Sequence, residues 1–201
     1  MDEIKVLYVF QEILPYVAES EGSLLGRKLP QKIQEKGAEI RTFMPRYGII
    51  NERKNQLHEV IRLSGMNVVI NDTDNPLIIK VASIPMARMQ VYFIDNEDYF
   101  KGLGILSNEK KEGYPNNDER AIFFTKGILE TVKKLRWTPN IIHLSGWMSH
   151  LLPIYIKNLY KDDPYYGDAK IIYSVANDTF SGNLSKNFAS KLADDNLPES
   201  I

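Results

Sequence analysis

The sequence predicts an α/β fold in which helices pack against a parallel sheet, and three observations support this prediction. The apolar run 5–10 is followed by a helical pattern over 23–36 and a second strand over 38–44. This order forms a right-handed crossover, which places the two strands parallel in one sheet. The stretch 137–147 contains a short apolar strand that ends abruptly in small residues. A further strand at 170–175 follows another helical segment, as repeated strand–helix units require.

The first unit has clear limits. Lys5–Phe10 is a continuous apolar run after a charged residue, which is typical of a central strand in a parallel sheet. The helix expected over Ser23–Lys36 carries an apolar stripe formed by Leu24, Leu25, Leu29 and Ile33. Pro30 lies inside this helix, so we expect a kink or a restart there. Gly37 is suited to end the helix.

The middle of the chain has a different pattern. The second strand, Ala38–Met44, ends at Pro45. Short apolar or alternating runs then predict a hairpin-rich, partly antiparallel insertion at about 56–95 that leads back into the sheet. These runs are His58–Leu63, Met66–Ile70, Leu77–Ile84 and Met89–Ile94. The polar cluster 71–76 is expected to form a turn, and 96–117 is expected to be a long loop.

The last third should be largely helical. The clearest helix is Asp118–Arg136, with Asn116 and Glu119 as its expected capping pair. A second helix is expected from about Ser149 to Tyr160, and the last strand is Lys170–Val175. The chain becomes polar after Asn177, so no closing element is expected there. At 201 residues, the whole chain 1–201 is expected to form one domain.

Composition excludes several classes of function. The chain has 25 basic and 26 acidic residues, and its net charge of −1 gives no basis for binding nucleic acid or a membrane surface. No run approaches the roughly 20 apolar residues of a membrane span, and the acidic start is no signal peptide. The lack of Cys excludes disulfides and thiolate chemistry and fits a cytoplasmic protein. Ligand-spaced histidines and glycine-rich phosphate loops are missing, so neither a metal nor a cofactor is predicted.

Small and polar residues follow the predicted strands, at the edge where α/β proteins bind ligands. Glu12 follows the first strand, and Gly146 and Trp147 follow the strand that ends near Leu144. Gly22 could let the backbone approach a phosphate at the start of the first helix, or could lie in a solvated loop. The candidate binding residues are therefore Glu12, Gly22, Gly146, Trp147 and Asn177, and no catalytic residue is identified.

These candidates also have structural interpretations. Glu12 could be a surface or capping residue, and Trp147 could fill the base of a helix rather than stack on a sugar. Asn177 either binds a ligand or turns the chain. His143 lies in an apolar run, which favours a buried, hydrogen-bonded core histidine. Arg120 could reach an anion in a cleft, but pairing with a neighbouring acid is commoner.

In the order of its motifs, the chain resembles the N-terminal half of bacterial glycogen synthases and plant starch synthases. The matching residues are Lys5–Phe10 with Glu12 and Pro15, Leu29-Pro30, Met44–Gly48, Tyr99-Phe100 with Gly102, Asn117 with Glu119-Arg120 and Phe124, Trp137 with Pro139, Ile141–His143, Trp147, and Val175 with Asn177. The resemblance implies a Rossmann-like half of a GT-B glycosyltransferase, with helices on both faces of the sheet. It also implies transfer of glucose from ADP-glucose to α-1,4-glucan in glycogen biosynthesis, with the C-terminal nucleotide-binding half absent from this chain.

The chain departs from this family at its polar motifs. The family's Lys-x-Gly-Gly-Leu places its lysine at Ala18, and its His-Asp-Trp-His falls on Ser145-Gly146-Trp147-Met148. Its Ile-His-Asn falls on Val175-Ala176-Asn177. The resemblance therefore implies an inactive domain, or a module that binds glucan or sugar nucleotide. The alternatives are an enzyme completed by residues or a subunit outside this chain, and an interaction domain without a carbohydrate ligand.

Overall fold

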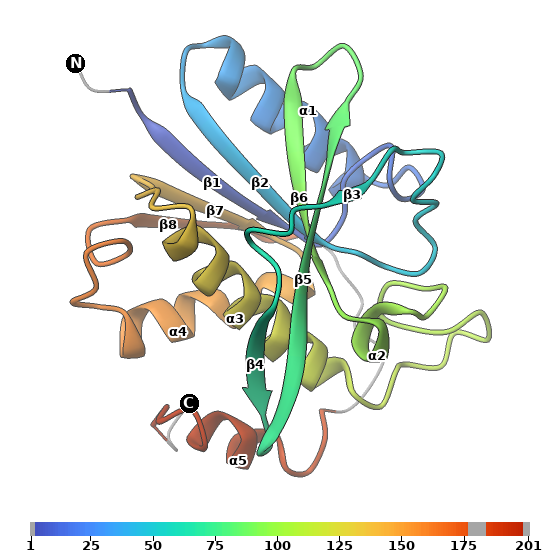
Figure 1. Ribbon diagram of the computed structural model, residues 1–201, viewed down its shortest axis with the longest axis vertical. Coiled ribbons are helices and arrows are strands. Elements are labelled where there is room, and N and C mark those ends of the chain that lie inside the picture. Colours follow the sequence, from blue (N-terminus) through green and yellow to red (C-terminus); the bar gives the residue numbers. More distant parts are fainter. Residues whose placement is uncertain (1–2, 177–183, 199–201) are drawn as a thin grey trace.

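A mixed sheet forms the centre of the protein in the computed structural model, which describes residues 3–176 and 184–198 (Figure 1). Its strand order is β3-β5-β6-β2-β1-β7-β8, and β4 pairs with β5 beside this path. The strands are β1 (Lys5–Phe10), β2 (Glu39–Pro45), β3 (His58–Glu59), β4 (Met66–Ile70), β5 (Thr73–Ile84), β6 (Met89–Asp95), β7 (Ile141–Ser145) and β8 (Lys170–Ser174). Strands β6, β2, β1, β7 and β8 run parallel, whereas β5 is antiparallel to β3, β4 and β6.

Helices cover both faces of this sheet. They are α1 (Glu21–Glu35), α2 (Glu97–Phe100), α3 (Asn117–Lys134), the 3-10 turn η1 (Trp147–Ser149), α4 (Leu152–Leu159) and α5 (Phe188–Ala193). Figure 1 shows α1 on one side of the sheet and α3 with α4 on the other. Residues Val6–Phe10 of β1 are all buried, because this strand lies at the centre with helices above and below it. The predicted α/β class and parallel sheet are confirmed.

Helix α1 begins two residues earlier than the sequence predicts and continues through Pro30. The Ser20 hydroxyl accepts the Ser23 N–H, and the Ser23 hydroxyl accepts the Ser20 N–H, so the two residues form a capping box. The predicted restart at Pro30 is wrong. Pro30 is buried, and we attribute the continuity of the helix to packing that offsets the lost hydrogen bond. Gly37 has a φ of 95° and ends the helix region as predicted.

The antiparallel part is more regular than expected. Asn71 and Asp72, with φ of 52° and 56°, form a two-residue hairpin turn, and β5 already begins at Thr73. The wider turn predicted over 71–76 is therefore wrong. The side-chain amide of Asn75 donates to Val68 O at 3.2 Å, which fastens this residue to β4. The run predicted as a strand from His58 contributes only the two residues of β3.

The region predicted as one long loop contains α2, which Asn96 caps by accepting the N–H groups of Asp98 and Tyr99. The predicted capping pair of α3 is wrong. Asn116 occupies the N-cap position but makes no side-chain cap hydrogen bond, and Glu119 instead pairs with Lys191 at 2.6 Å. The pairing with a residue far along the chain shows why a local capping pattern was misleading here.

A closing element is present, against expectation. Helix α5 lies against α3 because Lys191 pairs with Asp118 at 2.9 Å and with Glu119. Asp195 follows this helix and contacts both Lys126 and Tyr155, each at 2.5 Å. The helix predicted from about Ser149 to Tyr160 is α4, which begins at Leu152, after the 3-10 turn η1. In the described ranges, no helix has the length and apolarity needed to cross a membrane.

Candidate functional site

Strands β1 and β7 are neighbours, and their carboxyl ends meet at the same edge of the sheet. Phe10 pairs with Ser145, so Gln11 and Glu12 follow directly opposite Gly146. The N-terminus of α1 returns to this edge. A small hollow there is lined by Phe10, Gln11, Glu12, Gly22, Ser145, Gly146 and Ala176. The structure thus brings together three of the five sequence-predicted candidates.

Glu12 is half-buried and held by two neighbours. Its carboxylate accepts the Ser20 hydroxyl at 2.5 Å and the Gln11 side-chain amide at 3.3 Å. Gly22 lies close by, because a β-carbon at this position would be 3.7 Å from Glu12 Oε2. The carboxylate therefore faces the hollow as a preorganised hydrogen-bond acceptor, since helix α1 and strand β1 fix its surroundings.

Gly146 is the turn between β7 and η1. Its φ is 88°, a conformation that favours glycine, and a β-carbon there would lie 2.4 Å from the β-carbon of Gln11. Its carbonyl accepts the hydroxyls of Ser149 at 2.8 Å and Tyr173 at 2.9 Å. The position needs glycine for both its backbone conformation and its close contact, so the abrupt turn predicted at this position is present.

The other two candidates do not join this group. Trp147 is half-buried, and its ring contacts the ring of His150 at a centroid distance of 4.7 Å. It is not among the described residues that line the hollow. Asn177 lies outside the described residues. Two candidates thus remain predictions, while Glu12, Gly22 and Gly146 share one location.

Sequence reasoning missed Gln11, which lines the same hollow. Its side-chain carbonyl accepts the Met148 N–H at 3.1 Å, and only 5% of its surface is exposed. The available signal was its position, since a polar residue directly after a buried strand and before Glu12 must lie at the sheet edge. The hollow itself has room for about one water molecule, with a volume of about 10 Å³.

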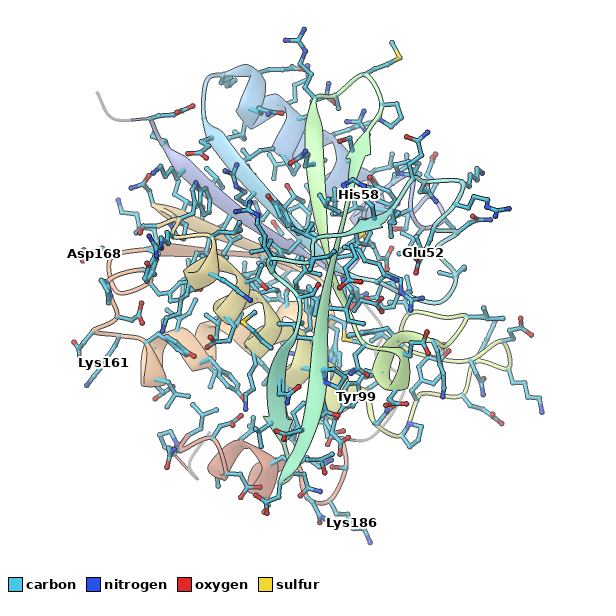
Figure 2. The ribbon with its side chains drawn as sticks, in the orientation of Figure 1. Glu52, His58, Tyr99, Lys161, Asp168 and Lys186 are labelled. Carbon is cyan, nitrogen blue, oxygen red and sulfur yellow. The ribbon has the colours of Figure 1, made fainter. Side chains whose placement is uncertain are left out.

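A second group of charged side chains lies at the ends of β2 and β6. Asp95 is buried and contacts Arg46 at 2.8 Å and Lys80 at 2.9 Å. Glu52, which is labelled in Figure 2, contacts Lys80 at 2.7 Å. Each charge in this group has an opposite partner, so the cluster joins the insertion to the parallel sheet and leaves no charge directed to a ligand.

A much larger hollow lies elsewhere and does not resemble a sugar site. It measures about 500 Å³ and lies beside α1, near the amino-terminal ends of β1 and β7. Its lining is mainly apolar, including Val6, Tyr8, Leu29 and Ile172. We favour the smaller hollow because it lies at the carboxyl edge and holds polar groups that can bind hydroxyls.

Histidines and Arg120 have structural contacts. His143 is half-buried, its Nε2 lies 2.8 Å from the Ser174 hydroxyl, and its ring packs against Tyr8 and Phe10.

Arg120 donates to the backbone carbonyls of Tyr99 and Ile105 rather than to an acid. No group of three or more possible metal ligands among His, Cys, Asp and Glu occurs within residues 3–176 and 184–198.

The half-buried histidines His143 and His150 predict a loss of stability in mild acid. Burial lowers the pKa of His143 and of His150, so the unfolded chain binds protons near its ordinary histidine pKa of about 6.5 before the folded chain does. The contribution of these histidines to the free energy of unfolding is therefore expected to be constant above that pH. It should fall as the pH is lowered through that value.

Urea unfolding at a series of pH values between 7.5 and 5 measures this effect. His143→Gln is expected to reduce the dependence on pH, because glutamine does not titrate. His58→Gln is the matched control, since His58 is exposed on β3. An unchanged pH dependence in His143→Gln would contradict the contribution of this histidine.

Comparison with known proteins identifies the family of this chain. The starch synthase catalytic domain family matches residues 5–199. A glycogen synthase of Chlorobium limicola is 39% identical over 198 residues, which cover 98% of this chain and 40% of the relative. One from Chlorobium luteolum is 38% identical over 202 residues, with the same coverage of 98% and 40%. The chain thus spans about two-fifths of the length of these curated relatives.

A solved structure shows the same fold. The catalytic domain of starch synthase IV from Arabidopsis thaliana, described as bound to ADP and acarbose, matches with a TM-score of 0.71. The match covers 86% of this chain and 34% of the plant chain at 16% identity, so it shows the GT-B type of fold alone. The family match and the sequence relatives, unlike the structural match, also show the family of this chain. The chain belongs to the starch synthase catalytic domain family and corresponds to the N-terminal part of the glycogen synthases.

Proposed function

We propose that this chain binds an α-glucan or the glucosyl part of a sugar nucleotide at the sheet-edge hollow, and that by itself it transfers little or no glucose. The observation that carries this proposal is the convergence of Glu12, Gly22 and Gly146 on one hollow at the carboxyl edge. The relatives are named glycogen synthases, and the plant structure is described with ADP and acarbose bound. Carbohydrate is therefore the ligand class that these resemblances support.

The groups at the hollow suit a neutral, hydroxyl-rich ligand. Glu12 supplies a carboxylate acceptor, and the Ser20 hydroxyl bonded to it is a second polar group. Sugar hydroxyls both donate and accept hydrogen bonds, and a bond to a charged acceptor contributes about 1.5–3 kcal/mol. We therefore assign Glu12 the role of anchoring one sugar hydroxyl.

The proposal of weak or absent transfer rests on what surrounds this anchor. Ser145, Gly146 and Met148 stand where the family resemblance places an acid and two histidines, and Ala18 stands where it places a lysine. Removal of one preorganised transition-state contact typically lowers a rate by about 10²–10³. Several such replacements leave binding as the function that the remaining groups support best.

Glu12→Gln tests the binding role. The substitution keeps the size of the side chain and removes its charge, so affinity for maltoheptaose is expected to fall about tenfold, which corresponds to about 1.4 kcal/mol. Isothermal titration calorimetry measures this change, with ADP-glucose as a second ligand. Glu59→Gln is the matched control, because Glu59 is exposed on β3 and lies outside the hollow lining.

Three outcomes separate the alternatives. Equal affinity of Glu12→Gln and the parent chain would place the glucan site elsewhere. Glucose transfer from ADP-glucose by this chain at the rate of a full-length relative would overturn the proposal of weak transfer. Failure to bind maltoheptaose, longer glucans and ADP-glucose would favour an interaction domain without a carbohydrate role. A cytoplasmic location stays a prediction from composition.

A further inference from the structure

Gln11 spans the base of the hollow from one strand end to the next. Its backbone N–H donates to Ser145 O at 3.0 Å, which extends the pairing of β1 and β7 by one residue. Its side-chain carbonyl accepts the Met148 N–H at 3.1 Å, and its amide donates to Glu12 Oε1 at 3.3 Å. Both ends of this buried side chain are therefore bound to groups at the site.

The side chain of Gln11 also lies directly along Gly146. A β-carbon at Gly146 would lie 2.4 Å from Cβ, 3.2 Å from Cδ and 3.3 Å from Cγ of Gln11. Such distances leave no room for a side chain at position 146. The closest of these contacts is to the Gln11 β-carbon, so Gly146 makes room for the residue that follows β1, and the rest of the Gln11 side chain packs along it.

This arrangement leaves little free volume. The hollow measures about 10 Å³, whereas pockets that enclose small molecules usually begin at about 300 Å³. The amide of Gln11 offers a donor to Glu12 and an acceptor to Met148 N–H. A sugar hydroxyl offers the same two functions. Gln11 therefore occupies the space and the hydrogen-bonding groups that one sugar hydroxyl would use.

We propose that Gln11 is the specificity-determining residue of this site: it fills an inner subsite for one sugar hydroxyl and restricts glucan to the mouth of the hollow. The inference rests on the proposed function, because it presupposes that glucan binds beside Glu12. It goes further by assigning the small size of the hollow to a single side chain. Shortening that side chain opens the subsite and frees Glu12 Oε1 and the Met148 N–H.

The experiment compares two substitutions that separate volume from hydrogen bonding. Gln11→Ser removes most of the side chain, and Gln11→Met keeps its length but removes both hydrogen bonds. We expect Gln11→Ser to bind maltoheptaose about tenfold more tightly than the parent chain. Gln11→Met should stay within about twofold of the parent, because it still fills the subsite. Gln90→Ser, at an exposed position on β6, is the matched control.

Folding is checked by thermal unfolding before titration. The backbone hydrogen bond from Gln11 to Ser145 is retained in every variant, and Gln11→Ala serves as a second shortened variant if Gln11→Ser does not fold. A crystal structure of the shortened variant with maltoheptaose provides an independent readout. A sugar hydroxyl bound between Glu12 Oε1 and the Met148 N–H supports the inference, and a collapsed hollow without sugar overturns it.

The titrations also distinguish the two proposals. If the parent chain binds maltoheptaose through Glu12 but Gln11→Ser gains nothing, the Gln11 inference fails and the proposed function stands. Equal gains in Gln11→Ser and Gln11→Met would overturn the assignment to volume. If neither the parent nor either shortened variant binds, the proposed function fails and the inference fails with it. Binding by the shortened variants alone supports the subsite and overturns binding by the parent chain.

Discussion

Arg120→Met is expected to lower the free energy of unfolding by about 3–5 kcal/mol, the largest loss that we predict for a single substitution. The Arg120 side chain is 1% exposed. It donates to Tyr99 O and Ile105 O at 2.7 Å each, and to Asn117 Oδ1 at 2.6 Å. Methionine fills a similar length but leaves these three acceptors without their donor, and each unsatisfied buried group costs about 1–3 kcal/mol.

Aromatic packing adds to this loss. The guanidinium lies over the ring of Tyr114 at 4.7 Å and over that of Phe100 at 5.3 Å, so it contributes cation–π contacts to both. Burial lowers the pKa of Arg120, which reflects the cost of placing the charge there. The residue connects the start of α3 to the segment 101–116, so its removal should loosen that segment first.

Urea unfolding measures the Arg120 effect directly. Arg62→Met is the matched control, because Arg62 is exposed and its replacement should change stability by less than about 0.5 kcal/mol. Arg120→Lys should give an intermediate loss, since lysine keeps the charge but lacks the planar fork. A loss below about 1 kcal/mol in Arg120→Met would show that the three hydrogen bonds are replaced by water.

Gly26→Ala is the second large effect, with an expected loss of about 2–4 kcal/mol from overpacking. A β-carbon at Gly26 would lie 2.4 Å from the backbone carbonyl of Glu12 and 3.0 Å from side-chain atoms of Ile13 and Phe10. Helix α1 can therefore approach the end of β1 only without a side chain at this position. Alanine must move either the helix or the backbone that carries Glu12, so maltoheptaose affinity should fall together with stability.

Gly22 provides the matched control in the same helix. Its added β-carbon would meet Glu12 Oε2 at 3.7 Å and Ser20 Oγ at 3.8 Å, which are ordinary contacts. Gly22→Ala is therefore expected to leave stability unchanged or raise it by up to about 1 kcal/mol, through helix propensity. Chemical denaturation of the two variants side by side decides the point. Similar stabilities would contradict the close approach of α1 at Gly26.

Much of the candidate site follows from the pattern of the strands. The apolar runs at β1 and β7 predict strands of one parallel sheet, and parallel strands place the residues after them at one edge. Glu12 and Gly146 could be nominated for this reason before their distance was known. Gln11 could not be assigned a role, because its function depends on a contact with Gly146, which is far away along the chain. No local pattern encodes such a pairing.

Other errors have a similar origin. Pro30 indicates a break by local rules, but its burial in α1 overrides them. Helix α5 is only six residues long, and besides the buried Leu192 it is held by ion pairs from Lys191 to Asp118 and Glu119, which no local pattern records. Asn116 and Glu119 match a capping pattern, yet Glu119 is engaged by α5. In each case a long-range contact replaces the local interaction on which the prediction depended.

The sequence by itself determined the α/β class, the central parallel strands and the sheet edge at which Glu12 and Gly146 lie. It could do so because hydrophobic periodicity and glycine positions act locally and leave a direct record in the chain. Only the tertiary structure decided that Gln11 fills the hollow beside Glu12, that Gly26 sets the approach of α1, and that Arg120 binds carbonyls. These properties depend on distances between residues far apart in the chain, which close packing fixes and periodicity does not contain.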